Sequence, residues 1–85
     1  MMPQRYLCEH DGWALRFECR ADVVHVDCFA PGVRNYGGKP TVELAYPVEI
    51  GKTLSAYGQQ YKAKAARDAA AVLEHDRGGG GGAAA

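Results

Sequence analysis

The chain has 85 residues, of which 47% are hydrophobic and 24% are charged, and these values are typical of a folded globular protein. Ten basic and ten acidic side chains give a formal net charge of zero, which excludes a strongly basic nucleic-acid-binding protein and an acidic mimic on bulk charge. No apolar run approaches the ~18 residues of a membrane span, and the N-terminus lacks the basic-then-apolar order of a signal peptide. We therefore expect a soluble protein with no membrane association.

Residues 1–77 are long enough for one compact domain, and residues 78–85 form a tail of glycine followed by alanine. Such a tail has the chemistry of a flexible linker, and it is either a native low-complexity end or a cloning remnant. Three cysteines form an odd set, which argues against a disulfide framework and favours a reducing cytoplasm: Cys8, Cys19 and Cys28.

The first half of the chain alternates between apolar and polar residues, which is typical of half-buried strands. Asp11 and Gly12 are a strong signal for a two-residue type I′ turn, because both central positions of that turn need a positive φ. A hairpin closed there pairs apolar with apolar residues and a cation with an anion. The predicted pairs are His10 with Trp13, Cys8 with Leu15, Tyr6 with Phe17 and Arg5 with Glu18.

A third strand is expected after a turn at residues 20–22, because alternation resumes there. Its predicted inner pairs are Cys19 with Val24, Phe17 with Val26 and Leu15 with Cys28. On the outer face, the same register places Glu18 opposite His25 and Arg16 opposite Asp27, so that charges fall opposite their complements.

Residues 29–40 contain two prolines and three glycines, so they are predicted to form a loop and not a strand. A fourth strand follows and stops at Pro47, and its core-facing residues are Val42, Leu44 and Tyr46. Val48 and Ile50 are expected to continue the apolar lining as far as a turn at Gly51.

From Thr53 the apolar period becomes helical, and one stripe contains Leu54, Tyr57, Tyr61, Ala65, Ala69 and Val72. Thr53 or Ser55 is expected to cap the helix N-terminus, and the glycines from Gly78 are expected to end the helix. The predicted fold is α+β, with one C-terminal helix packed on one face of a four-stranded antiparallel sheet, in the order β-β-β-β-α.

The cysteines together with His10 and His25 invite a metal site, but the predicted register opposes one. Cys8 and Cys28 are separated by about two strand spacings, roughly 10 Å, and Cys19 lies about 13 Å along the strand from Leu15. A zinc ion with sulfur bonds near 2.3 Å cannot gather three sulfurs so placed. We therefore expect inward-facing core cysteines, no metal and no other cofactor.

The sequence contains no complete catalytic set. The single serine, Ser55, is explained by its place at the predicted helix start. His25 lies between Glu18 and Asp27 in the predicted sheet and could act as a base, but cross-strand charge pairing produces the same pattern. Neither a phosphate-binding glycine loop nor a nucleophile elbow is present, so we expect a protein that is not an enzyme.

Two segments are candidates for partner contacts. The loop at residues 29–40 is long for a hairpin connection and offers Arg34, Tyr36 and Lys39, whose types include two that are enriched at binding hot spots. The alternative for this loop is a flexible connector with solubilising charges. The first and fourth strands would be sheet edges, so a partner strand or a second copy of the chain could pair there.

The second candidate segment is residues 51–67, which have four basic side chains and no acidic one. On a helical wheel, Gln60, Lys64 and Arg67 share the exposed side, where they could contact phosphates weakly and in a salt-sensitive way. The alternative is a solvated helix face on which Lys64 pairs with Asp68 at i+4.

Residues 9–13, with Leu15 and Phe17 after them and residues 51–56 opening the helix, resemble the HicB-type antitoxins. That resemblance implies a hairpin and helix that inhibit an RNA-cleaving toxin, although an extra loop and strands separate the two pieces here. Residues 64–70 are similar to the last helix of double-stranded-RNA-binding domains, whose first helix is missing here. The chain is not assigned to either family on these residues.

These observations favour a non-enzymatic binding protein that docks on a larger bacterial protein or ribonucleoprotein complex. By analogy of size, the expected role is that of a phage or mobile-element inhibitor of host defence, similar to an anti-CRISPR protein. The expected contacts are Arg34, Tyr36 and Lys39, and then Gln60, Lys64 and Arg67. The alternative is a nucleic-acid-binding accessory or antitoxin-like protein that uses the basic helix face, and homodimerisation through an edge strand is a further expectation.

Overall fold

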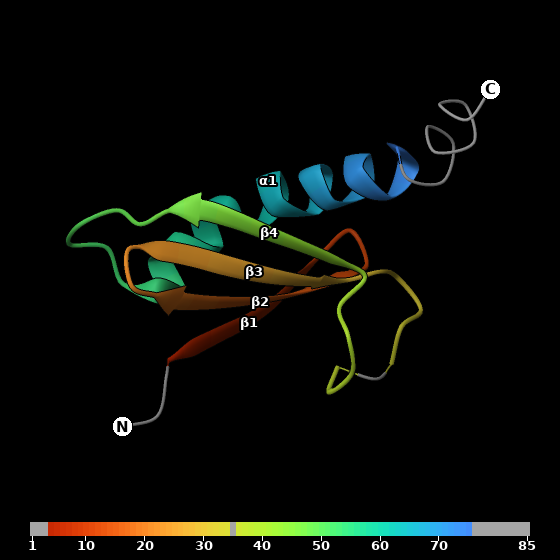
Figure 1. Ribbon diagram of the computed structural model, residues 1–85, viewed down its shortest axis with the longest axis horizontal. Coiled ribbons are helices and arrows are strands. Elements are labelled where there is room, and N and C mark those ends of the chain that lie inside the picture. Colours follow the sequence, from red (N-terminus) through yellow and green to blue (C-terminus); the bar gives the residue numbers. More distant parts are fainter. Residues whose placement is uncertain (1–3, 35, 76–85) are drawn as a thin grey trace.

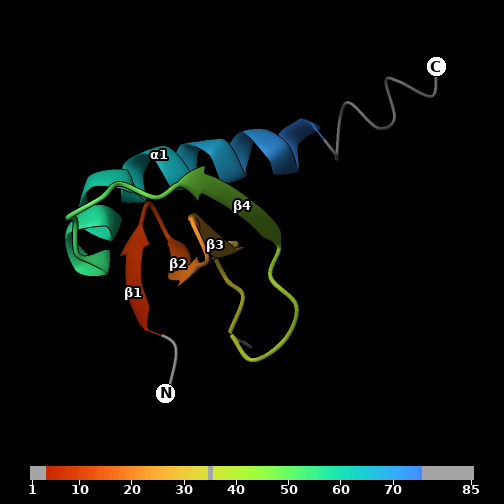
Figure 2. The same ribbon diagram turned by 60° about the vertical axis from the view of Figure 1, so that its left-hand side comes forward.

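A computed structural model of the chain describes residues 4–34 and 36–75, which form one sheet and one helix (Figure 1). The elements are β1 (Arg5–His10), β2 (Trp13–Arg20), β3 (Val23–Phe29), β4 (Val42–Pro47) and α1 (Leu54–Glu74). The four strands are antiparallel and lie in chain order, and α1 packs across one face of the sheet (Figure 2). The predicted α+β fold is therefore confirmed.

The strand register follows from the tight turns. Asp11 and Gly12 have φ values of 51° and 83°, as a type I′ turn requires, and the predicted hairpin pairs are all present. The second turn places Ala21 at a φ of 55°, and the predicted pairing between β2 and β3 is also confirmed. Two short turns thus determine which side chains of three strands face α1.

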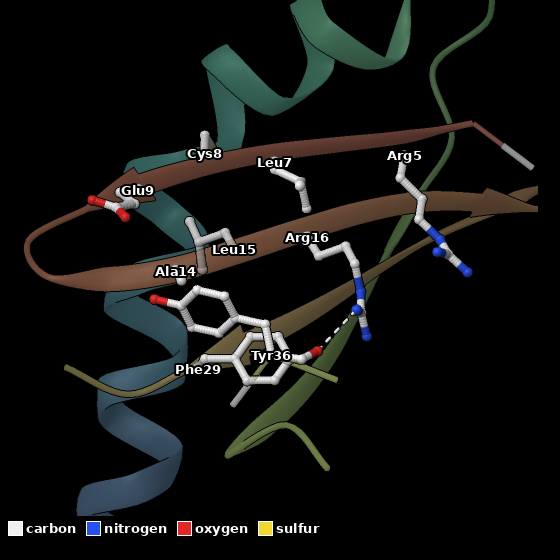
Figure 3. A pocket seen from close by; sticks show the side chains of 9 residues that line it. All are labelled: Arg5, Leu7, Cys8, Glu9, Ala14, Leu15, Arg16, Phe29 and Tyr36. Carbon is white, nitrogen blue, oxygen red and sulfur yellow. Dashed lines mark hydrogen bonds between the residues drawn. The ribbon is translucent and has the colours of Figure 1, made fainter. Parts of the chain in front are cut away.

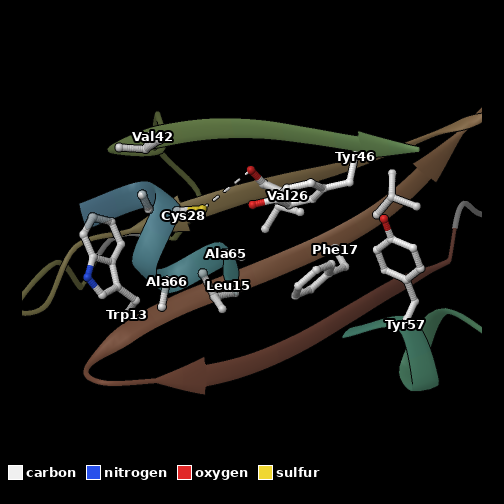
Figure 4. Close-up of a cluster of buried hydrophobic side chains, with 12 residues drawn as sticks. Trp13, Leu15, Phe17, Val26, Cys28, Val42, Tyr46, Tyr57, Ala65 and Ala66 are labelled. Carbon is white, nitrogen blue, oxygen red and sulfur yellow. Dashed lines mark hydrogen bonds between the residues drawn. The ribbon is translucent and has the colours of Figure 1, made fainter. Parts of the chain in front are cut away.

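The core lies between the sheet and α1 (Figure 4). Leu15, Phe17 and Val26 are fully buried at its centre, and each such side chain contributes about 1.5–3 kcal/mol relative to an exposed one. Alanines on the buried side of α1 allow the helix to approach the strands closely. The other members of the core are Trp13, Val24, Cys28, Val42, Tyr46, Tyr57, Ala65, Ala66 and Ala69.

The start of α1 is tied to the end of β4. Thr53 caps the helix as predicted, because its hydroxyl accepts a hydrogen bond of 3.2 Å from the Ala56 amide. The Tyr57 hydroxyl donates to the Pro47 carbonyl at 2.8 Å, and the Tyr61 hydroxyl donates to Glu49 at 2.6 Å. These bonds fix the first turns of the helix over the strand edge.

Two predictions about core-lining residues were wrong after the fourth strand. Ile50 is fully exposed, because residues 49–52 form a turn in which the Lys52 amide donates to the Glu49 carbonyl. Gly51 supplies the positive φ of that turn, and the Ile50 side chain points to solvent. Val72 is also exposed, and Leu73 packs against the core in its place, so the apolar stripe advances by four residues after Ala69.

Two further predictions were wrong at strand ends. Phe29 was assigned to the loop, but it is the last residue of β3 and lies opposite Ala14 in β2. Cys19 was placed in the core, but it is exposed near the end of β2, where its thiol donates to the Ala21 carbonyl at 3.7 Å. Cys8 is half-buried and Cys28 is buried, as expected of core cysteines.

The predicted tail at residues 78–85, and the prediction that its glycines end the helix, lie outside the described residues. Within residues 4–34 and 36–75, no helix has both the length and the apolar composition of a membrane span.

Gly58 gives the sharpest test of the helix-sheet packing. A Cβ at this position would overlap the Tyr6 ring and lie 3.4 Å from the Phe17 ring. We expect Gly58→Ala to lower the free energy of unfolding by about 1–2 kcal/mol, because overpacking outweighs the better helix propensity of alanine. Urea unfolding measures this change. Ala70→Gly at an exposed helix position calibrates the propensity difference, and a stabilised Gly58→Ala variant would contradict the close packing.

Candidate functional site

The face of the sheet opposite α1 has no second layer of helix or strand among the described residues, and ion pairs cover part of it. Arg16 donates to Asp27 with bonds of 3.2 and 2.6 Å, as the register predicted. Glu18 is paired with Arg5 at 3.8 Å and with Arg20 at 3.0 Å. These pairs neutralise the charges along β2 and β3 on this outer face.

The described residues of the loop between β3 and β4, 30–34 and 36–41, bend back over the outer face. The two ends of the loop are joined by a hydrogen bond of 3.0 Å, which the Ala30 amide donates to the Thr41 hydroxyl. The Tyr36 ring packs edge-on against Phe29 with 5.2 Å between the ring centroids, and the Tyr36 carbonyl accepts a bond of 3.2 Å from Arg16. Phe29 is consequently only 2% exposed although it belongs to the outer face.

Beside this loop the outer face has a concavity of about 400 Å³, which we call the outer-face pocket. Figure 3 shows the Leu7 side chain above the Phe29 and Tyr36 rings and the Arg16 guanidinium beside them. Its lining residues come from two strands, the end of a third and the loop: Arg5, Leu7, Cys8, Glu9, Ala14, Leu15, Arg16, Phe29 and Tyr36.

The outer-face pocket combines an apolar surface with charged neighbours. Leu7 is 69% exposed and Tyr36 is 47% exposed, so two large apolar side chains face solvent in one small area. Arg16 lies 5.4 Å from the centroid of the Phe29 ring, and its guanidinium therefore stiffens the pocket wall by a cation–π contact. This arrangement can hold an apolar side chain and contact a polar group beside it.

The pocket offers no reactive group. Burial raises the pKa of the Cys8 thiol, which keeps it protonated and a poor nucleophile at neutral pH. Burial likewise raises the pKa of Cys28 to about 12, and both thiols lie on the side of the sheet that faces α1. Among the residues that the structure describes, no three His, Cys, Asp or Glu side chains lie close enough together to hold a metal ion.

Of the three loop residues singled out in the sequence, Tyr36 lines the outer-face pocket, whereas Arg34 and Lys39 are exposed elsewhere on the loop. Sequence reasoning did not identify Leu7 or Phe29 as site residues. Leu7 carried a signal, because the predicted register places this apolar side chain on the outer face, where polar residues were expected. Phe29 gave no such signal, because it was assigned to the loop and not to the third strand.

The three helix residues singled out in the sequence are exposed, but they do not form one basic patch. Gln60 accepts a hydrogen bond from Lys52, and Lys64 lies 3.1 Å from Asp68, as the i+4 spacing predicted. Arg67 instead lines a shallow hollow beside the hairpin turn with His10 and Asp11. Of these three residues, only Arg67 thus keeps a cationic side chain that makes no ion pair with another described residue.

Comparisons with protein-family models, with curated proteins and with solved structures found no match for this chain.

Asp68, the partner of Lys64, also accepts a hydrogen bond from Tyr46, and this bond leads to a test with a defined pH dependence. The Tyr46 hydroxyl donates to Asp68 at 2.7 Å, and this bond is the main reason why the pKa of Asp68 lies below its usual value. A carboxyl group whose pKa is lower in the folded than in the unfolded chain stabilises the fold at pH values above its unfolded pKa. This contribution to stability is lost as the pH falls through the lowered pKa of the folded chain.

We therefore expect Tyr46→Phe to lower the free energy of unfolding by about 1–2 kcal/mol at neutral pH, with the difference shrinking in acid. Urea unfolding at several pH values measures it. Tyr36→Phe is the matched control, because the Tyr36 hydroxyl donates no hydrogen bond within the described residues. A loss of stability that does not change with pH would contradict the bond to a charged Asp68.

Proposed function

We propose that this chain is a non-enzymatic protein-binding module that docks through the outer-face pocket. The observation that carries the proposal is Leu7, which is exposed beside the packed rings of Tyr36 and Phe29 on a face that α1 leaves bare. An exposed apolar cluster with a polar rim is typical of an interaction site. The partner would place an apolar side chain against Leu7 and the Tyr36 ring.

The residue types favour a protein as the partner. Tyrosine and arginine are enriched at the centres of protein interfaces, because each combines a large contact area with a polar group. Tyr36, Arg16 and Arg5 all line the outer-face pocket. A site for a small molecule usually buries most of its ligand, whereas this concavity opens on a sheet surface that a second protein would have to close.

The pocket wall is prepared before binding. Arg16 holds the Tyr36 carbonyl and packs on Phe29, so the loop loses less conformational entropy when a partner docks. An inhibitor of a larger bacterial complex, such as a phage or mobile-element protein, needs only a preformed docking face of this kind. Such a role belongs to the cytoplasm, where the thiols of Cys8, Cys19 and Cys28 stay reduced.

The proposal predicts that capture of a partner depends on the Tyr36 ring and not on the helix cations. Tagged protein is incubated with a bacterial lysate, with and without nuclease, and the eluate is read by mass spectrometry. We expect Tyr36→Ala to reduce capture of a nuclease-resistant partner at least about 10-fold, because a hot-spot truncation costs about 2 kcal/mol or more. Tyr36→Phe should retain the partner, since it keeps the ring.

The helix variant Lys64→Glu with Arg67→Glu separates this function from nucleic-acid binding. Protein docking through the outer-face pocket leaves capture by this variant unchanged, and circular dichroism verifies that each variant is folded. A nucleic-acid-rich eluate that nuclease removes, and that this variant and high salt abolish, would contradict the proposal and identify the basic helix face as the binding site.

A further inference from the structure

β1 is an open edge of the sheet. It pairs with β2 on one side, and no other strand in the described part of the chain pairs with it. Its six residues contain neither proline nor glycine, and its pairing with β2 is continuous from Arg5 to His10 without a bulge. Natural edge strands often use prolines and bulges to prevent pairing, and β1 has neither, so β1 can still accept another strand.

The hairpin turn determines which backbone groups of β1 face that open edge. A two-residue type I′ turn closes on a hydrogen-bonded pair, here His10 and Trp13, and the hydrogen-bonded pairs then alternate along the strand. The amides and carbonyls of the even-numbered residues therefore point to β2. Those that point to the open edge belong to Arg5, Leu7 and Glu9.

The same three residues have their side chains on the outer face and are exposed. Leu7 is in the middle, with a cation two positions before it and an anion two positions after it. Two antiparallel copies of β1 centred on Leu7 therefore place Leu7 opposite Leu7, Arg5 opposite Glu9 and Glu9 opposite Arg5. Every outward-facing amide and carbonyl of these residues then meets a partner in the other copy.

Other registers between two β1 strands form fewer backbone hydrogen bonds or fewer ion pairs. A shift by one residue brings backbone groups that point to β2 opposite groups that point outward, so the bonds between the copies cannot form. A shift by two residues keeps the backbone match but places Leu7 opposite Arg5 or Glu9, which separates the charges from their complements. The pattern of β1 thus selects one symmetric register.

The charges of β1 are available for this pairing. Glu9 makes no ion pair within the described residues. Arg5 is 54% exposed and reaches Glu18 only at 3.8 Å, while Arg20 holds the same carboxylate at 3.0 Å. Arg5 can therefore turn to Glu9 of a second copy without leaving Glu18 unpaired.

From this complementarity we propose that the chain forms a symmetric homodimer in which two β1 strands pair antiparallel with Leu7 on the two-fold axis. Two four-stranded sheets become one continuous sheet, with both α1 helices on the same face. The two outer-face pockets then lie side by side across the Leu7 pair. This inference does not rest on the proposed function, but it would present two docking sites on one surface.

Sedimentation equilibrium of the purified chain over a wide concentration range tests the dimer directly. We expect a reversible monomer–dimer equilibrium, because six-residue edge pairing buries less than the ~1,200 Å² of a standard stable interface. Glu9→Arg places like charges opposite each other at both ends, and it should weaken the dimer at least about 10-fold. The double variant Arg5→Glu with Glu9→Arg restores opposite charges, and it should recover most of the affinity.

Glu43→Arg is the matched control, because Glu43 is an exposed carboxylate on β4 at the other edge of the sheet. It should leave the dimer unchanged. A wild-type chain that stays monomeric at the highest concentration, or a dimer that Glu43→Arg weakens and Glu9→Arg does not, would overturn the proposal. Partner capture by the Tyr36 variants is a separate readout, so either inference can fail alone.

Disulfide trapping tests the register itself. Leu7→Cys in a Cys8→Ser, Cys19→Ser background places a thiol at the two-fold axis, where hydrogen-bonded residues have Cα atoms about 5.5 Å apart, a separation suited to a disulfide. We expect this variant to form a covalent dimer under mild oxidation much faster than Glu43→Cys in the same background. Equal rates for the two variants would show that Leu7 does not lie at the axis.

Discussion

The Arg16 side chain connects the parts of the molecule that matter most for its outer face. It pairs with Asp27 on β3, donates to the Tyr36 carbonyl in the loop and lies over the Phe29 ring. Arg16 and Asp27 are both largely withdrawn from solvent, so their bond is stronger than that of an ordinary surface pair. One guanidinium thus orders the loop and shields Phe29, and the outer-face pocket exists because of both effects.

A sheet covered by a single helix has two faces with different requirements. The face under α1 buries apolar side chains in a continuous core, whereas the outer face must be compatible with water. Ion pairs satisfy this requirement around Glu18 and Asp27, and the loop satisfies it over Phe29. Around Leu7 neither solution is present, and this is why both the docking function and the edge-to-edge dimer involve that residue.

The sequence was informative wherever structure depends on neighbouring residues. The turn at Asp11 and Gly12 and the complementary pairs across the strands were sufficient to predict two registers, because a one-residue slip would reverse every side chain. Ile50 was misplaced because the turn at Gly51 rotates its side chain outward. The contact between Arg16 and Tyr36 spans 20 residues of sequence and has no local pattern, so the pocket could not be predicted from periodicity.

The central claim is that the loop lies against the outer face with the Tyr36 ring on Phe29, and a nuclear Overhauser spectrum of the isotope-labelled chain tests it most directly. With ring centroids 5.2 Å apart, we expect cross-peaks between the ring protons of Tyr36 and Phe29. Cross-peaks between the β2–β3 partners Phe17 and Val26 serve as the internal standard for a folded sheet. If that standard is present and the Tyr36–Phe29 cross-peaks are absent, the loop does not form the pocket wall, and the proposed docking face does not exist.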